Sequence, residues 1–208
     1  MHSVAIVCYE GVDEVELFGP FDVLSSVRTM EKGHWSNDPA FDVKIVAETV
    51  GRTVTSHGVA LYPQAAYPNA SQYDIIIVPG GPGARLIKYP ESLKGWLTKQ
   101  CAGAKVVVSL STGAFILARS GVLAKRRVAI YPAFAADIRR IEPTANVVTG
   151  ERVIMDRNSL ISTSGISNSI DAVIALIEKI EGIRSAEIAS KRISWPVHID
   201  DIAPLYSS

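Results

Sequence analysis

Ser111 follows an apolar segment, at a position from which its hydroxyl could attack a substrate. Residues 106–108 are three valines that favour a buried strand, and residues 114–118 favour a helix. The segment between them, Ser-Leu-Ser-Thr-Gly at 109–113, predicts a sharp turn that lifts Ser111 clear of the sheet edge, as the nucleophile elbow of α/β enzymes does. A serine that only caps the following helix is the alternative interpretation.

A glycine-rich loop could supply the donors that such a nucleophile needs. The segment 79–83 reads Pro-Gly-Gly-Pro-Gly, and glycines allow the backbone to turn tightly and to present its N–H groups to a ligand. One or two amides of this loop could form an oxyanion hole beside Ser111, and the Thr112 amide, at a helix N-terminus, also favours negative charge there. The segment matches neither a Walker loop nor G-x-G-x-x-G, and a plain tight loop is the alternative.

Glu16 is a candidate functional acid near the start of the first predicted helix. It is one of four acids in the segment 10–16, and the apolar residues Val15, Leu17 and Phe18 flank it. A carboxyl held among apolar groups is desolvated, which raises its pKa. The other acids of this segment are expected to be solvated.

A hydrolase triad is a weaker alternative. The chain order Ser, Asp, His allows Ser111, Asp171 and His198, but nothing in their spacing favours that set. The four histidines also show no metal-ligand spacing, so no metal site is predicted. They are His2, His34, His57 and His198.

Alternating strand and helix patterns predict a single α/β domain over residues 1–208. Its fold class is a three-layer, flavodoxin-like sandwich whose mostly parallel central sheet has short apolar strands covered on both faces. The predicted strands are 4–9, 41–47, 73–78, 105–110, 128–131 and 160–163. The predicted helices include 17–30, 166–180 and 184–193, and hairpins are predicted at 53–61 and 146–155. In this class, sites form beyond the carboxyl ends of the strands.

Composition narrows the possible functions. With 21 basic and 21 acidic residues, the net charge is zero, which disfavours nucleic acid or an anionic membrane as partner. Cys8 and Cys101 are too few for a disulfide framework, and we expect both to be packed. No signal peptide is recognisable, and no apolar run reaches the roughly 20 residues of a membrane span. These features predict a cytoplasmic protein.

The pieces together resemble one family. They are Ala-Ile-Val-Cys-Tyr at 5–9, Glu-Leu-Phe-Gly-Pro-Phe-Asp-Val-Leu at 16–24, the glycine loop at 79–83, Ser-Leu-Ser-Thr-Gly-Ala at 109–114 and Gly-Ile-Ser-Asn-Ser-Ile-Asp at 165–171. This set resembles the ThiJ/PfpI superfamily, which has a class-I glutamine-amidotransferase-like fold. The acidic-Leu-x-Gly-Pro segment and the elbow look most like those of isonitrile hydratases.

The resemblance implies a site and a reaction. It places Glu16 opposite the nucleophile position, with backbone amides near Gly81 and Thr112 for negative charge and Gly80 in the pocket. It also matches Gly165 and Ile166 to a Gly-Ile pair facing the nucleophile. The implied reaction adds water to an isonitrile to give an N-substituted formamide through a covalent intermediate. A small-molecule substrate, a homodimer and no cofactor are the further expectations.

Two departures from the family pattern affect the activity. The family nucleophile is a cysteine, and Ser111 replaces it here. Since a serine hydroxyl ionises far less readily than a thiol, we expect weak or absent activity. Related chains also often carry Thr-His-Trp near 129–134, where this chain has no histidine. Two alternatives remain: a cofactor-free glyoxalase, and a non-catalytic small-molecule sensor or binding protein.

Overall fold

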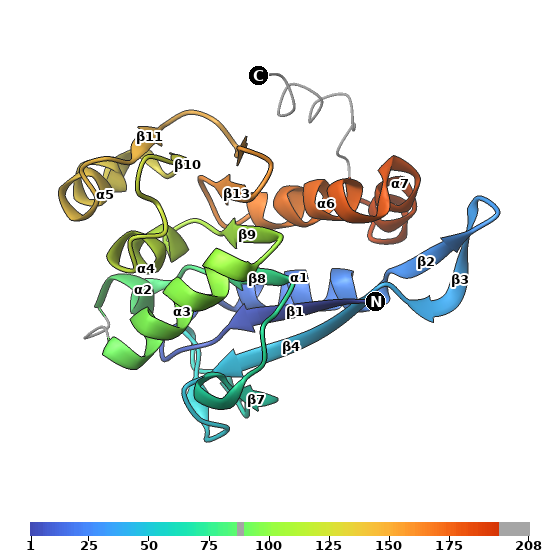
Figure 1. Cartoon of the computed structure of the whole chain (residues 1–208), viewed down its shortest axis with the longest axis horizontal. Coiled ribbons are helices and arrows are strands. Elements are labelled where there is room, and N and C mark those ends of the chain that lie inside the picture. Colours follow the sequence, from blue (N-terminus) through green and yellow to red (C-terminus); the bar gives the residue numbers. More distant parts are fainter. Residues whose placement is uncertain (87–89, 196–208) are drawn as a thin grey trace.

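The computed structural model describes residues 1–86 and 90–195 around a seven-stranded sheet (Figure 1). Every neighbouring pair of its strands is parallel except β12 and β13. Among β1, β4, β8, β9 and β13, the spatial order is 2-1-3-4-5 in chain sequence, which is the flavodoxin-like order. Across the sheet the strands are β12 (Val153–Asp156), β13 (Leu160–Thr163), β9 (Val106–Ser109), β8 (Ile75–Val78), β1 (His2–Val7), β4 (Phe41–Ala47) and β7 (Ala65–Ala66).

Helices cover both faces of this sheet, which confirms the predicted three-layer fold. Figure 1 shows α1 (Glu14–Ser26) behind the sheet and α3 (Glu91–Gly103) in front of it. Helix α6 (Asn168–Glu181) packs against α1, and α4 (Gly113–Arg119) packs against β8 and β9. Because the central strands are covered on both sides, every residue of β8 and β9 is buried.

Smaller elements complete the described chain. A hairpin of β5 (Thr53–Val54) and β6 (Ala60–Leu61) lies where a hairpin was predicted. Helix α7 (Ile183–Arg192) follows α6, as predicted. The remaining helical segments are α2 (Pro82–Leu86), α5 (Ala135–Ile141), and the short 3₁₀ turns Tyr67–Asn69 and Pro132–Phe134.

In the carboxyl-terminal half, one predicted strand was confirmed but lies outside the central sheet, and one predicted hairpin was wrong. The segment predicted as a strand at 128–131 forms β10 (Arg127–Ala129), which lies outside the central sheet and pairs in parallel with β11 (Asn146–Val148). The predicted hairpin at 146–155 therefore does not exist. Its first half belongs to this small sheet, and its second half is β12, which pairs with β13 at the edge of the large sheet.

The helix predicted at 17–30 begins earlier and ends earlier, because Asp13 caps α1 and the chain leaves the helix at Val27. Residues beyond it form a hairpin that was not predicted, made of β2 (Arg28–Glu31) and β3 (His34–Pro39). Its two-residue turn, Lys32 and Gly33, has positive φ angles of 49° and 83°, as tight hairpins require.

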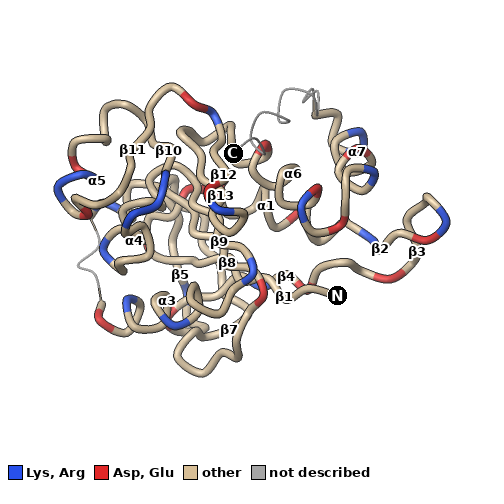
Figure 2. Tube along the Cα trace, turned by 45° about the horizontal axis from the view of Figure 1, so that its top comes forward, with Lys and Arg blue, Asp and Glu red and all other residues tan. Residues whose placement is uncertain are grey.

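Buried apolar side chains form one cluster that includes Cys8, and Cys101 packs against it. Both cysteines are unbonded, and burial raises the pKa of each thiol to about 12. Charges of both signs occur together on α3, α5 and α7 (Figure 2). Within the described residues, no helix has the length and apolar character needed to cross a membrane.

Candidate active site

The site lies where three neighbouring strands end. Strands β9, β8 and β1 are adjacent and parallel, so their carboxyl ends share one edge of the sheet. The loop after β1 reaches the loop after β8 through two backbone hydrogen bonds, from the Asp13 amide to the Gly80 carbonyl (2.9 Å) and from the Gly83 amide to the Gly11 carbonyl (3.0 Å). The three segments selected from the sequence are thus brought together.

Ser111 occupies the elbow after β9 in a left-handed conformation. Its φ is +44°, which costs a residue with a side chain about 1–2 kcal/mol. Helix α4 begins only two residues later and packs closely against β8. A Cβ on Gly113 would lie 2.1 Å from the Val78 carbonyl oxygen, so only glycine fits there. The Ser111 residue is buried at the carboxyl edge of the sheet, with 8% of its surface still exposed.

Glu16 is buried in the first turn of α1, with 0% of its surface exposed. Its Oε2 accepts the Gly80 amide, whereas its Oε1 is buried with no hydrogen-bond partner among the described residues. Burial raises the pKa of Glu16 to about 7, the Gly80 amide lowers it and the Asp13 charge raises it. The Ser111 hydroxyl is near enough to lower that pKa slightly, without reaching full hydrogen-bond geometry to Oε1.

Gly80 and Gly81 fit this site because neither carries a Cβ. On Gly80 a Cβ would lie 2.5 Å from Thr112 Oγ1 and 2.9 Å from Glu16 Oε2. Gly81 has a φ of +125°, and a Cβ there would lie 2.5 Å from the Gly11 carbonyl oxygen. The Tyr9 hydroxyl fixes the same loop from beneath by donating to the carbonyls of Pro79 and Gly80.

Side-chain oxygens already bond three backbone amides of the site. The Gly80 amide donates to Glu16, and the Gly81 amide donates to Thr112 Oγ1 at 2.9 Å. The Ser111 amide donates to Thr163 Oγ1 at 3.0 Å. The Gly81 amide, which was predicted as an oxyanion donor, is therefore occupied in this structure. In the described part of the chain, only the Thr112 amide among these predicted donors has no acceptor.

Thr163 is a site residue that sequence reasoning missed. It was predicted as the last residue of a strand, and it is the last residue of β13 with 0% of its surface exposed. An alternating or apolar pattern places such a residue inside the fold but does not show what its hydroxyl binds. Its position beside the elbow follows from the pairing of β13 with β9, which sequence alone did not give.

Among the described residues, three other predicted site residues make no hydrogen bond to Ser111. Gly165 and Ile166 form the turn between β13 and α6, and Ile166 is 47% exposed. Their predicted role opposite the nucleophile stays a prediction. Asp171 of the alternative triad is bound by Arg152 at 2.6 Å and by the Trp195 indole at 2.8 Å, so its carboxylate is already engaged. His198 lies outside the described residues.

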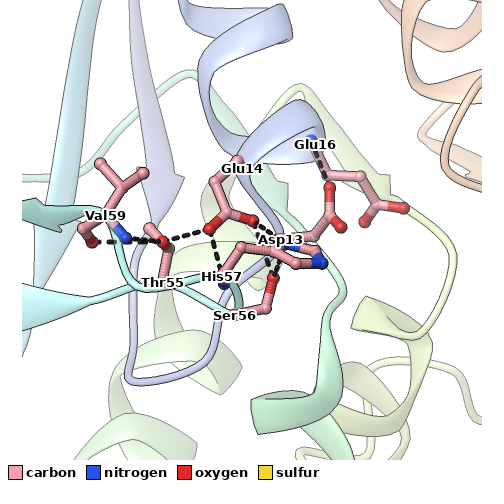
Figure 3. A network of polar contacts seen from close by, with 7 residues as sticks. All are labelled: Asp13, Glu14, Glu16, Thr55, Ser56, His57 and Val59. Atoms are coloured by element: carbon pink, nitrogen blue, oxygen red, sulfur yellow. Dashed lines mark hydrogen bonds and ion pairs between the residues drawn. The ribbon is translucent and has the colours of Figure 1, made fainter.

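A second carboxylate supports the first turn of α1 from its other side. Figure 3 shows Glu14 pointing to the turn of the β5–β6 hairpin, whereas Glu16 points away from it. The Glu14 carboxylate accepts hydrogen bonds from the hydroxyls of Thr55 and Ser56 and from both the backbone amide and Nδ1 of His57. Although burial raises the pKa of Glu14, these hydrogen bonds lower it well below its ordinary value.

A strained elbow, a buried acid and a glycine loop at the carboxyl edge of a parallel sheet define the class of this site. The chain belongs to the DJ-1/PfpI family, whose family model matches residues 2–179. A curated relative, the isonitrile hydratase of Pseudomonas putida, is 25% identical over 194 residues, covering 93% of this chain and 78% of the relative. In the described residues, no group of three His, Cys, Asp or Glu side chains is placed to hold a metal.

Solved structures share the fold. A ThiJ/PfpI family protein from Pseudomonas syringae has a TM-score of 0.79 at 21% identity, over 95% of this chain and 76% of that one. An AraC family transcriptional regulator from Pseudomonas putida has a TM-score of 0.78 at 19% identity, over 93% and 100%. Drosophila melanogaster DJ-1beta has a TM-score of 0.78 at 18% identity, over 93% and 97%. At these identities the likeness concerns the fold alone.

Proposed function

We propose that this site performs isonitrile-hydratase-type chemistry, adding water to the terminal carbon of an isonitrile to give an N-substituted formamide. One observation carries the proposal: Glu16 is a buried acid with a raised pKa of about 7, its Oε1 has no hydrogen-bond partner among the described residues, and the Ser111 hydroxyl lies near enough to affect its pKa. A carboxyl with this pKa is largely protonated just below neutral pH, so it can act as a general acid.

The proposed reaction needs a proton at carbon. When a nucleophile at residue 111 attacks the isonitrile carbon, one π pair of the carbon–nitrogen triple bond moves to nitrogen, and the carbon keeps its own lone pair with the negative charge. Glu16 donates its proton there, which gives a covalent imidate-type intermediate. Water then adds to this intermediate, and the bond to residue 111 breaks as the formamide leaves. The sum is one isonitrile and one water consumed for one formamide formed.

The occupied amides favour this chemistry over acyl transfer. Attack on an ester, an amide or a dicarbonyl places negative charge on oxygen, which backbone N–H donors must stabilise. Here the amides of Gly80, Gly81 and Ser111 already donate to side-chain oxygens, and in the described residues only the Thr112 amide among the predicted donors is left for an oxyanion. An isonitrile carbon is neutralised by a proton instead, and Glu16 can supply one. The glyoxalase alternative requires charge on oxygen and is therefore less well supported.

Ser111 limits the rate that we expect from this chain. An ionised Glu16 is a stronger base than an ordinary carboxylate because its pKa is raised to about 7. A serine hydroxyl nevertheless stays un-ionised near neutral pH, whereas a cysteine thiol of ordinary pKa near 8.5 ionises readily. We therefore expect slow turnover or none from the chain as it stands, and a clear gain with Ser111→Cys.

The test is conversion of an aryl isonitrile to its formamide by the parent chain, Ser111→Cys and Ser111→Ala. We expect measurable turnover with Ser111→Cys, none with Ser111→Ala, and weak or no turnover with the parent. Circular dichroism should show that all three are folded. Free cysteine at equal concentration is the control. If the folded Ser111→Cys protein produces no more formamide than free cysteine does, the proposal is rejected.

A second candidate function is binding without turnover. The replacement of a thiol by Ser111, with no histidine positioned beside it in the described residues, favours this alternative. It predicts that the parent chain binds a small neutral molecule and that Ser111→Cys does not convert it. Titration calorimetry of the same isonitrile with the parent chain measures the binding, and the conversion assay with Ser111→Cys measures the turnover. The two measurements together separate the two functions.

A further inference from the structure

The elbow at residue 111 is fixed from the neighbouring strand. Pairing between β13 and β9 extends as far as Ser162 opposite Ser109. Beyond that point β9 bends away, so the amide of Ser111 leaves the ladder of backbone hydrogen bonds. This amide is buried, and an unpaired buried amide is strongly unfavourable. The Thr163 hydroxyl, at 3.0 Å, replaces the missing backbone acceptor.

The conformation of Ser111 makes this hydrogen bond consequential. A φ of +44° is disfavoured for serine and persists only where the surroundings enforce it. The flanking backbone bonds run from the Leu110 amide to Val78, from the Gly113 amide to Leu110 and from the Ala114 amide to the Ser111 carbonyl (3.3 Å), and none uses the Ser111 amide. The amide is therefore held by Thr163, and the direction of the side chain at 111 depends on that contact.

We propose that Thr163 is a positioning residue, whose hydroxyl accepts the Ser111 amide and thereby directs the side chain at 111 toward Glu16. It also keeps this amide from acting as a donor to bound substrate. The proposal rests on residue 111 as the reactive position of the proposed function. Thr163 does not itself touch the reacting atoms.

The experiment follows the reactivity of a thiol at residue 111 rather than turnover. In the Ser111→Cys protein, the rate of alkylation by iodoacetamide is measured across pH. The parent chain, with only Cys8 and Cys101, supplies the background, because burial raises the pKa of both of these thiols to about 12. The same measurement is then made with Thr163→Val, which keeps the shape but cannot accept, and with Thr163→Ser, which can.

We expect Thr163→Val to move the thiol at 111 away from Glu16 and to slow its alkylation at pH 7 about tenfold, a shift of about one pH unit in its profile. Thr163→Ser should stay within about twofold of the Ser111→Cys protein, because one hydrogen-bond acceptor is retained. Equal rates and profiles for the valine and serine variants, both folded, would overturn the proposal.

Two further points keep the test decisive. Should Thr163→Val not fold, Thr163→Ala removes the same acceptor without adding volume, and the same comparison with Thr163→Ser applies. Alkylation does not require isonitrile turnover, so an inactive Ser111→Cys protein with a Thr163-dependent profile rejects the proposed function and leaves this inference standing. If the Ser111→Cys protein converts the isonitrile but its alkylation profile does not depend on Thr163, the proposed function stands and this inference is rejected.

Discussion

Replacing Glu16 with glutamine separates the charge of this side chain from its shape. Glutamine has nearly the same volume, and its carbonyl oxygen can still accept the Gly80 amide. Its amide nitrogen then takes the place of Oε1, the buried oxygen without a partner. An unsatisfied amide there costs about 1–3 kcal/mol, but this cost is the same at every pH. The informative quantity is therefore the pH dependence of the difference in stability.

The magnitude follows from the pKa of Glu16, which burial raises from 4.5 to about 7 in the folded protein. The difference, about 2.5 pH units at about 1.4 kcal/mol each, corresponds to about 3 kcal/mol. The folded state binds this proton more tightly than the unfolded state, so stability is greatest below pH 4.5 and falls as the pH rises toward about 7. Above that range the loss is complete. Because glutamine at this position has no proton to lose, the Glu16→Gln protein does not show this loss of stability.

Urea unfolding of both proteins at two pH values measures this effect. Between about pH 5 and about pH 8.5, the stability of Glu16→Gln relative to the parent should rise by about 2–3 kcal/mol. Titrations elsewhere in the chain cancel in the comparison. Glu91→Gln is the matched control, because the Glu91 side chain is 88% exposed. Its stability relative to the parent should change little over the same range. Parallel curves for Glu16→Gln and Glu91→Gln would refute the burial argument and the acid role built on it.

Further outcomes follow from neighbouring contacts. Gly80→Ala places a Cβ 2.5 Å from Thr112 Oγ1, so the free energy of unfolding in urea should fall by about 1–3 kcal/mol. Gly95→Ala, whose Cβ meets open space on α3, should raise it by about 0.5–1 kcal/mol. Because hydrogen bonds lower the pKa of Glu14, Glu14→Gln should destabilise the protein by about 1 kcal/mol at neutral pH, and the deficit should shrink progressively as the pH falls below 4.5 toward the lowered pKa of the folded state. Native Cys8, with a thiol pKa of about 12, should resist iodoacetamide at pH 8 but react in urea. Mass spectrometry of the alkylated protein checks this.

The central sheet was predictable because buried parallel strands are apolar throughout. Strands β4 and β13 have the predicted bounds, and the carboxyl ends of β1, β8 and β9 meet as the α/β pattern requires. The error at 146–155 has a physical cause. Two short strands separated by a glycine-containing turn resemble a hairpin, but which partner each strand joins depends on contacts distant in sequence. Here β11 pairs with β10, and β12 with β13.

The hydrogen bonds that the backbone amides of the site donate could not be predicted from the sequence, for a different reason. Gly81 and Thr112 were chosen correctly as neighbours, since they contact each other. Their spacing could not show that the Thr112 hydroxyl accepts the Gly81 amide, because a side-chain rotamer decides it. The same holds for Thr163 and Ser111, which are 52 residues apart in the chain. Whether an amide is free for a ligand is a property of the folded site alone.

Glu14 and Glu16 show why the buried acid could be selected from sequence, and where that reasoning was incomplete. Glu16 was selected because apolar residues flank it, yet its neighbour Val15 is 52% exposed. Burial in a helix comes from residues three or four positions away and from packing across the fold, not from sequence neighbours. Residues two apart face different sides of a helix, so one turn of α1 presents one acid to the hydroxyl-rich hairpin and the other to the buried loop at Gly80. Several donors stabilise the charge on Glu14 and lower its pKa. Glu16 is buried and has one backbone donor among the described residues, so burial raises its pKa to about 7. Such a divergence between two nearby carboxyls is the basis on which we propose Glu16 as the proton donor.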